Sequence, residues 1–140
     1  RSPVNDPRAV QASLSEVLAT SDVVTVHLPL TDQTRNVISA AQLSGMKRSA
    51  ILVNTSRGGL VNETDLAHAL KRQVSAGAGL DVLTTEPPRH GNPLLDLDLP
   101  NFLLTPHVAW ASQEAMSSLA GQLVENLNAF VSGRPQNLVT

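Results

Sequence analysis

Four short apolar runs, each about as long as a buried β-strand, alternate along this chain with segments of helical character. The runs cover residues 23–28, 50–53, 76–80 and 102–104. Capping and periodicity patterns predict helices at residues 13–20, 39–46, 62–72 and 113–131. Strands that alternate with helices form βαβ units, whose strands run parallel because a crossover connection joins them. The pattern therefore predicts an α/β fold with a doubly wound parallel sheet.

The predicted helices carry their own start and stop signals. Ser13 and Glu16 have the spacing of a capping box, and Asn62 is a good N-cap residue for the third helix. The last helix, residues 113–131, places a stripe of apolar side chains on one side, which is the pattern of a face that packs against a core. Gly133 follows it and can end it in a C-cap geometry.

Two segments read as loops. Residues 1–12 are polar and rich in turn-forming residues, and residues 84–100 contain four prolines with little periodicity. A loop as long as the second inside a compact domain is often functional.

Composition excludes several classes of function. The 140 residues carry a net charge of −2 with basic residues scattered singly, which argues against a nucleic-acid surface. No apolar run approaches the roughly 20 residues of a membrane span. The chain has no cysteine, and its four histidines show no metal-ligand spacing, so we expect no metal site. We expect a cytoplasmic protein.

Charged or ionisable side chains follow three of the apolar runs. Arg57 comes after the second run, Asp81 and Glu86 after the third, and His107 after the fourth. The carboxyl ends of parallel strands lie side by side, and ligands of open α/β sheets bind there. The pattern predicts a guanidinium, carboxylates and an imidazole in one crevice, which suits an anionic substrate and a proton transfer.

The segments around these residues resemble the D-isomer-specific 2-hydroxyacid dehydrogenases. The resemblance rests on NTSRGGLV at 54–61, on DV at 81–82 with EPP at 86–88, on TPHVAW at 105–110, and on HLPLT at 27–31 with Thr34. It extends over about residues 13–140. Pro87-Pro88 and Ala109-Trp110 most resemble the branch of the family that acts on glycerate and hydroxypyruvate.

The resemblance implies the C-terminal part of a Rossmann-type sheet. The family's first strand, its Gly-x-Gly-x-x-Gly turn and its substrate domain have no counterpart in this sequence. We assign residues 1–112 to a partial NAD(P)-binding domain. We assign residues 113–140 to a C-terminal helix and tail that pack back toward the substrate domain.

The resemblance also implies three catalytic residues. Arg57 would fork onto the carboxylate of a 2-oxo acid, His107 would exchange a proton with the substrate oxygen, and Glu86 would pair with His107 and orient it. An arginine in an ordinary turn, a strand-end histidine bonded to backbone and a solvated loop glutamate are the alternatives.

Cofactor contacts are implied as well. Asp81 would meet the nicotinamide carboxamide, although a buried aspartate that caps backbone amides is an alternative. The full set of residues implied to contact the cofactor is His27, Pro29, Thr34, Thr55, Ser56, Arg57, Asp81, His107 and Ala109. A strand-ending turn with a side-chain hydrogen bond explains the first three nearly as well.

The implied activity is hydride transfer between NAD or NADP and a small 2-hydroxy acid, with hydroxypyruvate/D-glycerate or glyoxylate/glycolate favoured. The family commonly dimerises through its coenzyme domain, so we expect a homodimer. Two alternatives stay open. One is an NAD(H)-sensing binding module like the C-terminal-binding-protein corepressors, and the other is a catalytically inert fragment of a dehydrogenase.

Overall fold

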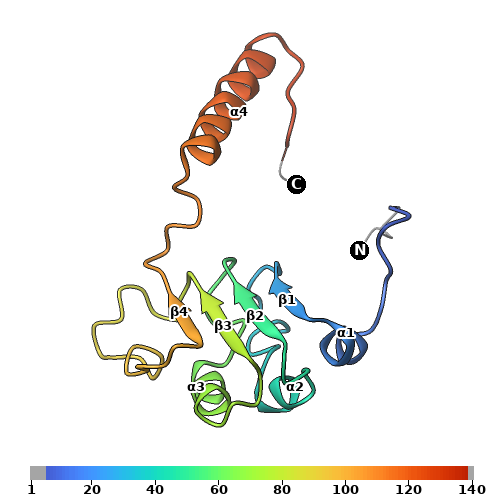
Figure 1. The fold of residues 1–140 in the computed structure, drawn as a ribbon. Coiled ribbons are helices and arrows are strands. Elements are labelled where there is room, and N and C mark those ends of the chain that lie inside the picture. Colours follow the sequence, from blue (N-terminus) through green and yellow to red (C-terminus); the bar gives the residue numbers. More distant parts are fainter. Residues whose placement is uncertain (1–5, 139–140) are drawn as a thin grey trace. The chain divides into compact units, whose positions relative to one another are not determined.

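The computed structural model describes residues 6–138, and it divides into two units, Arg1–Pro106 and His107–Thr140. The first unit is a four-stranded parallel sheet with helices (Figure 1). Its elements are α1 (Leu14–Thr20), β1 (Val23–Val26), α2 (Ala40–Ser44), β2 (Ile51–Asn54), α3 (Glu63–Lys71), β3 (Gly77–Leu80) and β4 (Phe102–Leu104). The strands lie in the order β1-β2-β3-β4, and every neighbouring pair is parallel. The predicted parallel α/β fold is confirmed.

The helix starts follow the predicted capping chemistry. The hydroxyl of Ser13 accepts a hydrogen bond from the Glu16 amide at 3.2 Å, and Asn62 Oδ1 accepts one from the Asp65 amide at 3.0 Å. At α2 the bonds run the other way, since Gln42 Oε1 accepts from the hydroxyl of Ser39 at 2.6 Å. Each cap satisfies polar groups at a helix end, so the boundaries are set by local sequence.

The core of the first unit lies between the sheet and the helices that cover one of its faces. Alternate strand residues such as Val24 and Leu52 are buried, together with Leu43 of α2 and Leu66 of α3. The strand residues in between point to the opposite face, where Val23, Ile51 and Leu103 are exposed. The burial pattern shows a sheet packed on one face by helices of its own unit.

Several segments differ from their predicted bounds; α2 ends at Ser44 rather than at residue 46, and β3 begins at Gly77 rather than at residue 76. β1 ends at Val26, so His27 and Leu28 lie beyond the strand, and β2 is shifted one residue toward the C-terminus. Of the predicted N-terminal loop, residues 1–5 lie outside the described residues, and residues 6–12 contain no helix or strand. Residues 84–100 likewise form a long irregular loop, as predicted.

The second unit contains α4 (Gln113–Val131), whose bounds match the predicted helix. The Ser112 hydroxyl accepts a hydrogen bond from the Ala115 amide at 3.1 Å, and Gly133 follows the helix with a φ of +70°. None of the residues of α4 is buried. That the apolar stripe of α4 packs back toward a substrate domain remains a prediction. Among residues 6–138, no helix is both long and apolar enough to cross a membrane.

Candidate active site

The four strands of the first unit end on one cross-strand row. In the observed register Val26 pairs with Asn54, Asn54 with Leu80, and Leu80 with Leu104. These are the last residues of β1, β2, β3 and β4. The segments that follow the strands therefore leave the sheet along a single edge, as the sequence predicts for a ligand-binding edge.

The Arg57 turn after β2 is held by the buried side chain of Asn54, which is 1% exposed. Asn54 Nδ2 donates to the Arg57 carbonyl at 2.9 Å, and Asn54 Oδ1 accepts from the Ser56 amide at 3.1 Å. The Ser56 hydroxyl donates to the Leu28 carbonyl at 3.0 Å, which ties this turn to the segment after β1. The backbone of Arg57 is thus fixed, while its side chain is exposed and its Nη1 donates to the Ser56 carbonyl at 2.7 Å.

Gly58 brings the Arg57 turn against the segment that follows β3. A Cβ atom at Gly58 would lie 1.9 Å from the Leu83 carbonyl oxygen and 2.5 Å from the Thr84 nitrogen. Only glycine permits this approach, because backbone atoms cannot give way as a flexible side chain can. The structure therefore brings the segments that carry Arg57 and Glu86 together.

Glu86 lies three residues beyond Leu83 in the long loop. Its side chain is exposed, and its Oε1 accepts a hydrogen bond from the Leu83 amide at 2.6 Å. The carboxylate is therefore anchored to the same peptide segment that touches Gly58. The backbone of Leu83 therefore connects the turn of Arg57, the predicted anion anchor, with Glu86, the predicted carboxylate.

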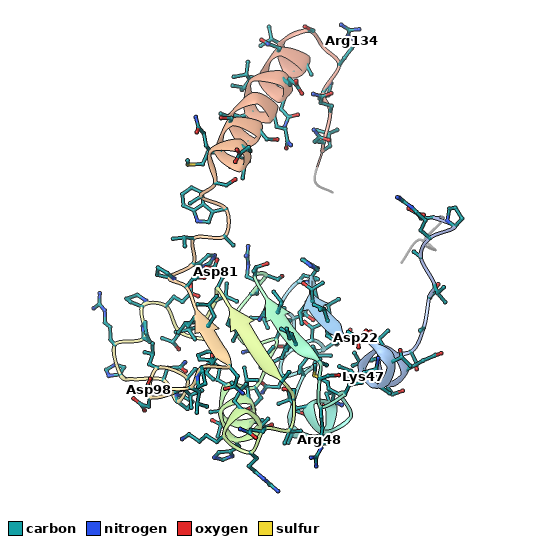
Figure 2. All side chains as sticks on the ribbon, in the orientation of Figure 1. Asp22, Lys47, Arg48, Asp81, Asp98 and Arg134 are labelled. Atoms are coloured by element: carbon teal, nitrogen blue, oxygen red, sulfur yellow. The ribbon has the colours of Figure 1, made fainter. Side chains whose placement is uncertain are left out.

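Asp81 directly follows β3 and is 2% exposed. The Thr105 hydroxyl donates a hydrogen bond to Asp81 Oδ1, and the Thr105 amide donates to the Leu80 carbonyl at 3.0 Å. Asp81 is labelled at the end of its strand in Figure 2. A buried carboxylate needs such donors, because an unpaired one would be costly. Thr105 has no predicted role, although it lies two residues before His107.

The segment after β1 is a hydrogen-bonded turn. Thr34 Oγ1 donates to the Pro29 carbonyl at 2.6 Å and accepts from the Thr31 amide at 2.8 Å. His27 Nε2 shares a hydrogen bond of 2.8 Å with Thr25 Oγ1. The local turn that the sequence analysis kept as an alternative is present. The implied adenine-side role of His27, Pro29 and Thr34 remains a prediction.

His107 and Ala109 belong to the second unit. His107 has a φ of +57°, a left-handed backbone conformation that few non-glycine residues adopt. Its carbonyl accepts a hydrogen bond from Trp110 Nε1 at 3.0 Å. Held backbone conformations of this kind are found at functional sites more often than elsewhere. The predicted arrangement of His107 with Arg57 and Glu86 remains a prediction.

The side chains at this edge include groups that could hold the nicotinamide end of a dinucleotide, and the contacts themselves remain a prediction. Asp81 is a carboxylate acceptor at the strand edge, and a carboxamide NH₂ group is a matching donor. Thr55, immediately after β2, is exposed at the same edge. Within residues 6–138, no three His, Asp or Glu side chains are grouped so that they could hold a metal ion.

Comparison with known proteins identifies relatives for this arrangement. Residues 2–109 match the family described as D-isomer specific 2-hydroxyacid dehydrogenase, NAD binding domain. The glycerate dehydrogenase of Methylorubrum extorquens is 58% identical over 133 residues, which are 95% of this chain and 42% of that protein. The glyoxylate reductase of Korarchaeum cryptofilum is 50% identical over 127 residues, which are 90% of this chain and 38% of that protein.

Solved structures give the same result. An acyclic imino acid reductase (Bsp5) in complex with NADPH and D-Arg superimposes with a TM-score of 0.81 at 35% identity, over 96% of this chain and 43% of that one. The NAD-complexed D-isomer-specific 2-hydroxyacid dehydrogenase of Lactobacillus delbrueckii ssp. bulgaricus gives 0.79 at 31% identity, over 92% and 43%. The chain thus spans less than half the length of each of these four relatives.

Proposed function

The chain belongs to the D-isomer-specific 2-hydroxyacid dehydrogenase family through its NAD-binding domain, and from this membership we propose that the whole protein reduces a small 2-oxo acid with NAD(P)H. The favoured substrate pairs are hydroxypyruvate/D-glycerate and glyoxylate/glycolate. Relatives named glycerate dehydrogenase, glyoxylate reductase and hydroxypyruvate reductase support this choice. NADPH and NAD in the related complexes support either coenzyme.

One observation carries the proposal beyond family membership. The close approach of Gly58 to the Leu83–Thr84 peptide places the exposed Arg57 turn and the Glu86 loop next to each other at the strand edge. A guanidinium there can fork onto a substrate carboxylate and polarise the neighbouring carbonyl. Substrate orientation and charge stabilisation are therefore the proposed tasks of Arg57.

The proposed proton donor is His107, oriented by Glu86 as the family resemblance implies. When bound, the nicotinamide would supply the hydride for carbon C2 of the 2-oxo acid. His107 gives its proton to the carbonyl oxygen, so that a hydroxyl forms, and it takes that proton back in the oxidation. The proposal includes Asp81 as the acceptor for the carboxamide, a homodimeric assembly and a cytoplasmic location.

The test is coenzyme oxidation by the whole protein with hydroxypyruvate and with glyoxylate. We expect saturable turnover, and we expect Arg57→Lys to lower kcat/KM at least about tenfold, which is about 1.4 kcal/mol of transition-state stabilisation. Lysine keeps the charge but loses the planar fork. The matched control is Arg89→Lys. Arg89 is an exposed arginine in the long loop, and this substitution should leave kcat/KM unchanged.

Two results would contradict the proposal. Tight NADH binding without turnover on either acid would favour the nucleotide-sensing binding module. Turnover that Arg57→Lys leaves intact would remove Arg57 from the substrate site.

A titration of the 140-residue chain asks what this part contributes alone. Trp110 is the only tryptophan of the chain, and its indole Nε1 donates a hydrogen bond to the His107 carbonyl. Saturable fluorescence quenching by NADH or NADPH would show that a coenzyme half-site is present and which nucleotide it prefers. The absence of quenching would favour the inert-fragment alternative for the isolated chain.

A further inference from the structure

The geometry points to Glu63 as a positioning residue that holds the Glu86 loop in place against the Arg57 turn. Glu63 is the first residue of α3, and it is distant from Glu86 in the sequence. The inference rests on the proposed function only in the role that it gives to Glu86. The sequence predicts Glu63 only as a negative charge in the first turn of α3, where it favours the helix.

The carboxylate of Glu63 binds both ends of one loop segment. Its Oε1 accepts a hydrogen bond from the Thr84 amide at 2.6 Å, and its Oε2 accepts one from Asn92 Nδ2 at 2.7 Å. Asn92 is 9% exposed, and its Oδ1 in turn accepts from the Leu94 amide at 2.9 Å. One side chain on a helix thus spans residues 84–92, the part of the loop that contains Glu86.

The Thr84 amide is the important contact, because it stands beside the site. The preceding amide, that of Leu83, donates to Glu86 Oε1 at 2.6 Å. The carbonyl of the same Leu83 is the atom that a Cβ at Gly58 would strike. Two consecutive amides therefore donate to two glutamates. The Leu83 amide donates to Glu86 of the proposed site, and the Thr84 amide donates to Glu63 of α3. A shift of this peptide would move both the Glu86 anchor and the contact with the Arg57 turn.

The chemistry requires a carboxylate at this position. Two donors face Glu63, and only a carboxylate offers an acceptor oxygen to each of them. A glutamine has one oxygen and one NH₂ group, so one of the two donors would meet another donor. Hydrogen bonds to a charged acceptor are also the stronger kind.

A plainer explanation is that Glu63 only stabilises α3, since a negative charge in the first turn favours a helix. Glu16 provides the matched control, because it is an exposed carboxylate in the first turn of α1. Glu63→Gln and Glu16→Gln each remove one negative charge from the first turn of a helix, at its first and third residue respectively. Only the first removes a contact to the loop.

The first experiment measures amide hydrogen exchange in the 140-residue chain and requires no activity. We expect Glu63→Gln to speed exchange at the Leu83 and Thr84 amides about tenfold or more, the loss of one charge-assisted hydrogen bond. Glu16→Gln should leave both amides unchanged. Asn92→Ala removes the other partner of Glu63 and should give a smaller increase. If exchange at the Leu83 and Thr84 amides is unchanged in both Glu63→Gln and Asn92→Ala, the inference is overturned.

The second experiment measures coupling to Glu86 in the whole protein. We expect Glu63→Gln to lower kcat about tenfold with the coenzyme KM nearly unchanged, and the double variant with Glu86→Gln to be no slower than Glu86→Gln alone. A purely structural role would make the two effects multiply, and that result would overturn the inference. If the unsubstituted protein shows no turnover, the proposed function fails while the exchange result still decides the position of the loop.

Discussion

The two units of this chain use similar sequence patterns with different results. In α3, a nine-residue helix, Leu66, Ala67, Ala69 and Leu70 are buried, whereas none of the residues of the 19-residue α4 is buried. Both helices begin with a side-chain cap, and both carry apolar residues on one side. The comparison shows that an amphipathic pattern predicts a helix but does not show what that helix packs against. Packing of a buried face stabilises α3, as it does most helices in proteins, whereas the packing partner of α4 remains a prediction.

The comparison predicts its largest difference at buried leucines. Leu66→Ala should cost about 2–5 kcal/mol of unfolding free energy, because Leu66 is 0% exposed and its removal leaves a cavity. Leu123→Ala in α4 should stay within about 0.5 kcal/mol, because Leu123 is 60% exposed. Urea unfolding of the 140-residue chain measures both. Equal losses would show that the stripe of α4 is buried in solution.

Glycine positions predict effects of opposite sign. Gly58→Ala should destabilise the first unit by about 1–3 kcal/mol, since its Cβ would overlap the Leu83 carbonyl. Gly121→Ala should stabilise α4 by about 0.5–1 kcal/mol, since nothing lies within 4 Å of its Cβ and alanine is the better helix former. Thermal unfolding followed at 222 nm measures the two. A neutral Gly58→Ala would show that the Arg57 turn and the Glu86 loop do not touch.

Two asparagines give the smallest and sharpest comparison. Asn54→Ala should cost about 1–3 kcal/mol, because it leaves the partly buried Ser56 amide and Arg57 carbonyl without their buried partner. Asn126→Ala should change stability by less than about 0.5 kcal/mol, because its hydrogen bond to Asn137 is exposed. Amide exchange at Ser56 provides a local check. Protection that survives Asn54→Ala would mean that the turn is held by other contacts.

Much of the fold was predictable, because its signals are local. The β-branched run at Val23–Val26 and the capping residues Ser13 and Asn62 act within a few residues of themselves. The end of β1 was predicted two residues too late. It is set by the cross-strand row that Val26 shares with Asn54, 28 residues away, and no local pattern contains that pairing.

The candidate site was predictable in part. Arg57, Asp81 and Glu86 follow strands that the pattern identifies, and the structure places the segments of Arg57 and Glu86 in contact. Neither Asn54 nor Glu63 was predicted to support the site, although Asn54 holds the Arg57 turn and Glu63 bonds the loop that carries Glu86. For Asn54 the available signal was a polar asparagine at the end of an apolar run, and the structure shows that this residue is buried. No signal marked the second, because its partners lie 21 and 29 residues further along the chain.

The sequence by itself determined the helices, the strands, their parallel direction and the residue types at the strand ends, because capping, periodicity and steric preference act over one or two turns. Only the tertiary structure decided the register that aligns the four strand ends, the approach of Gly58 to Leu83 and the bridge from Glu63 to the loop. These features depend on atoms that are far apart in the sequence and meet only when the core of the first unit packs.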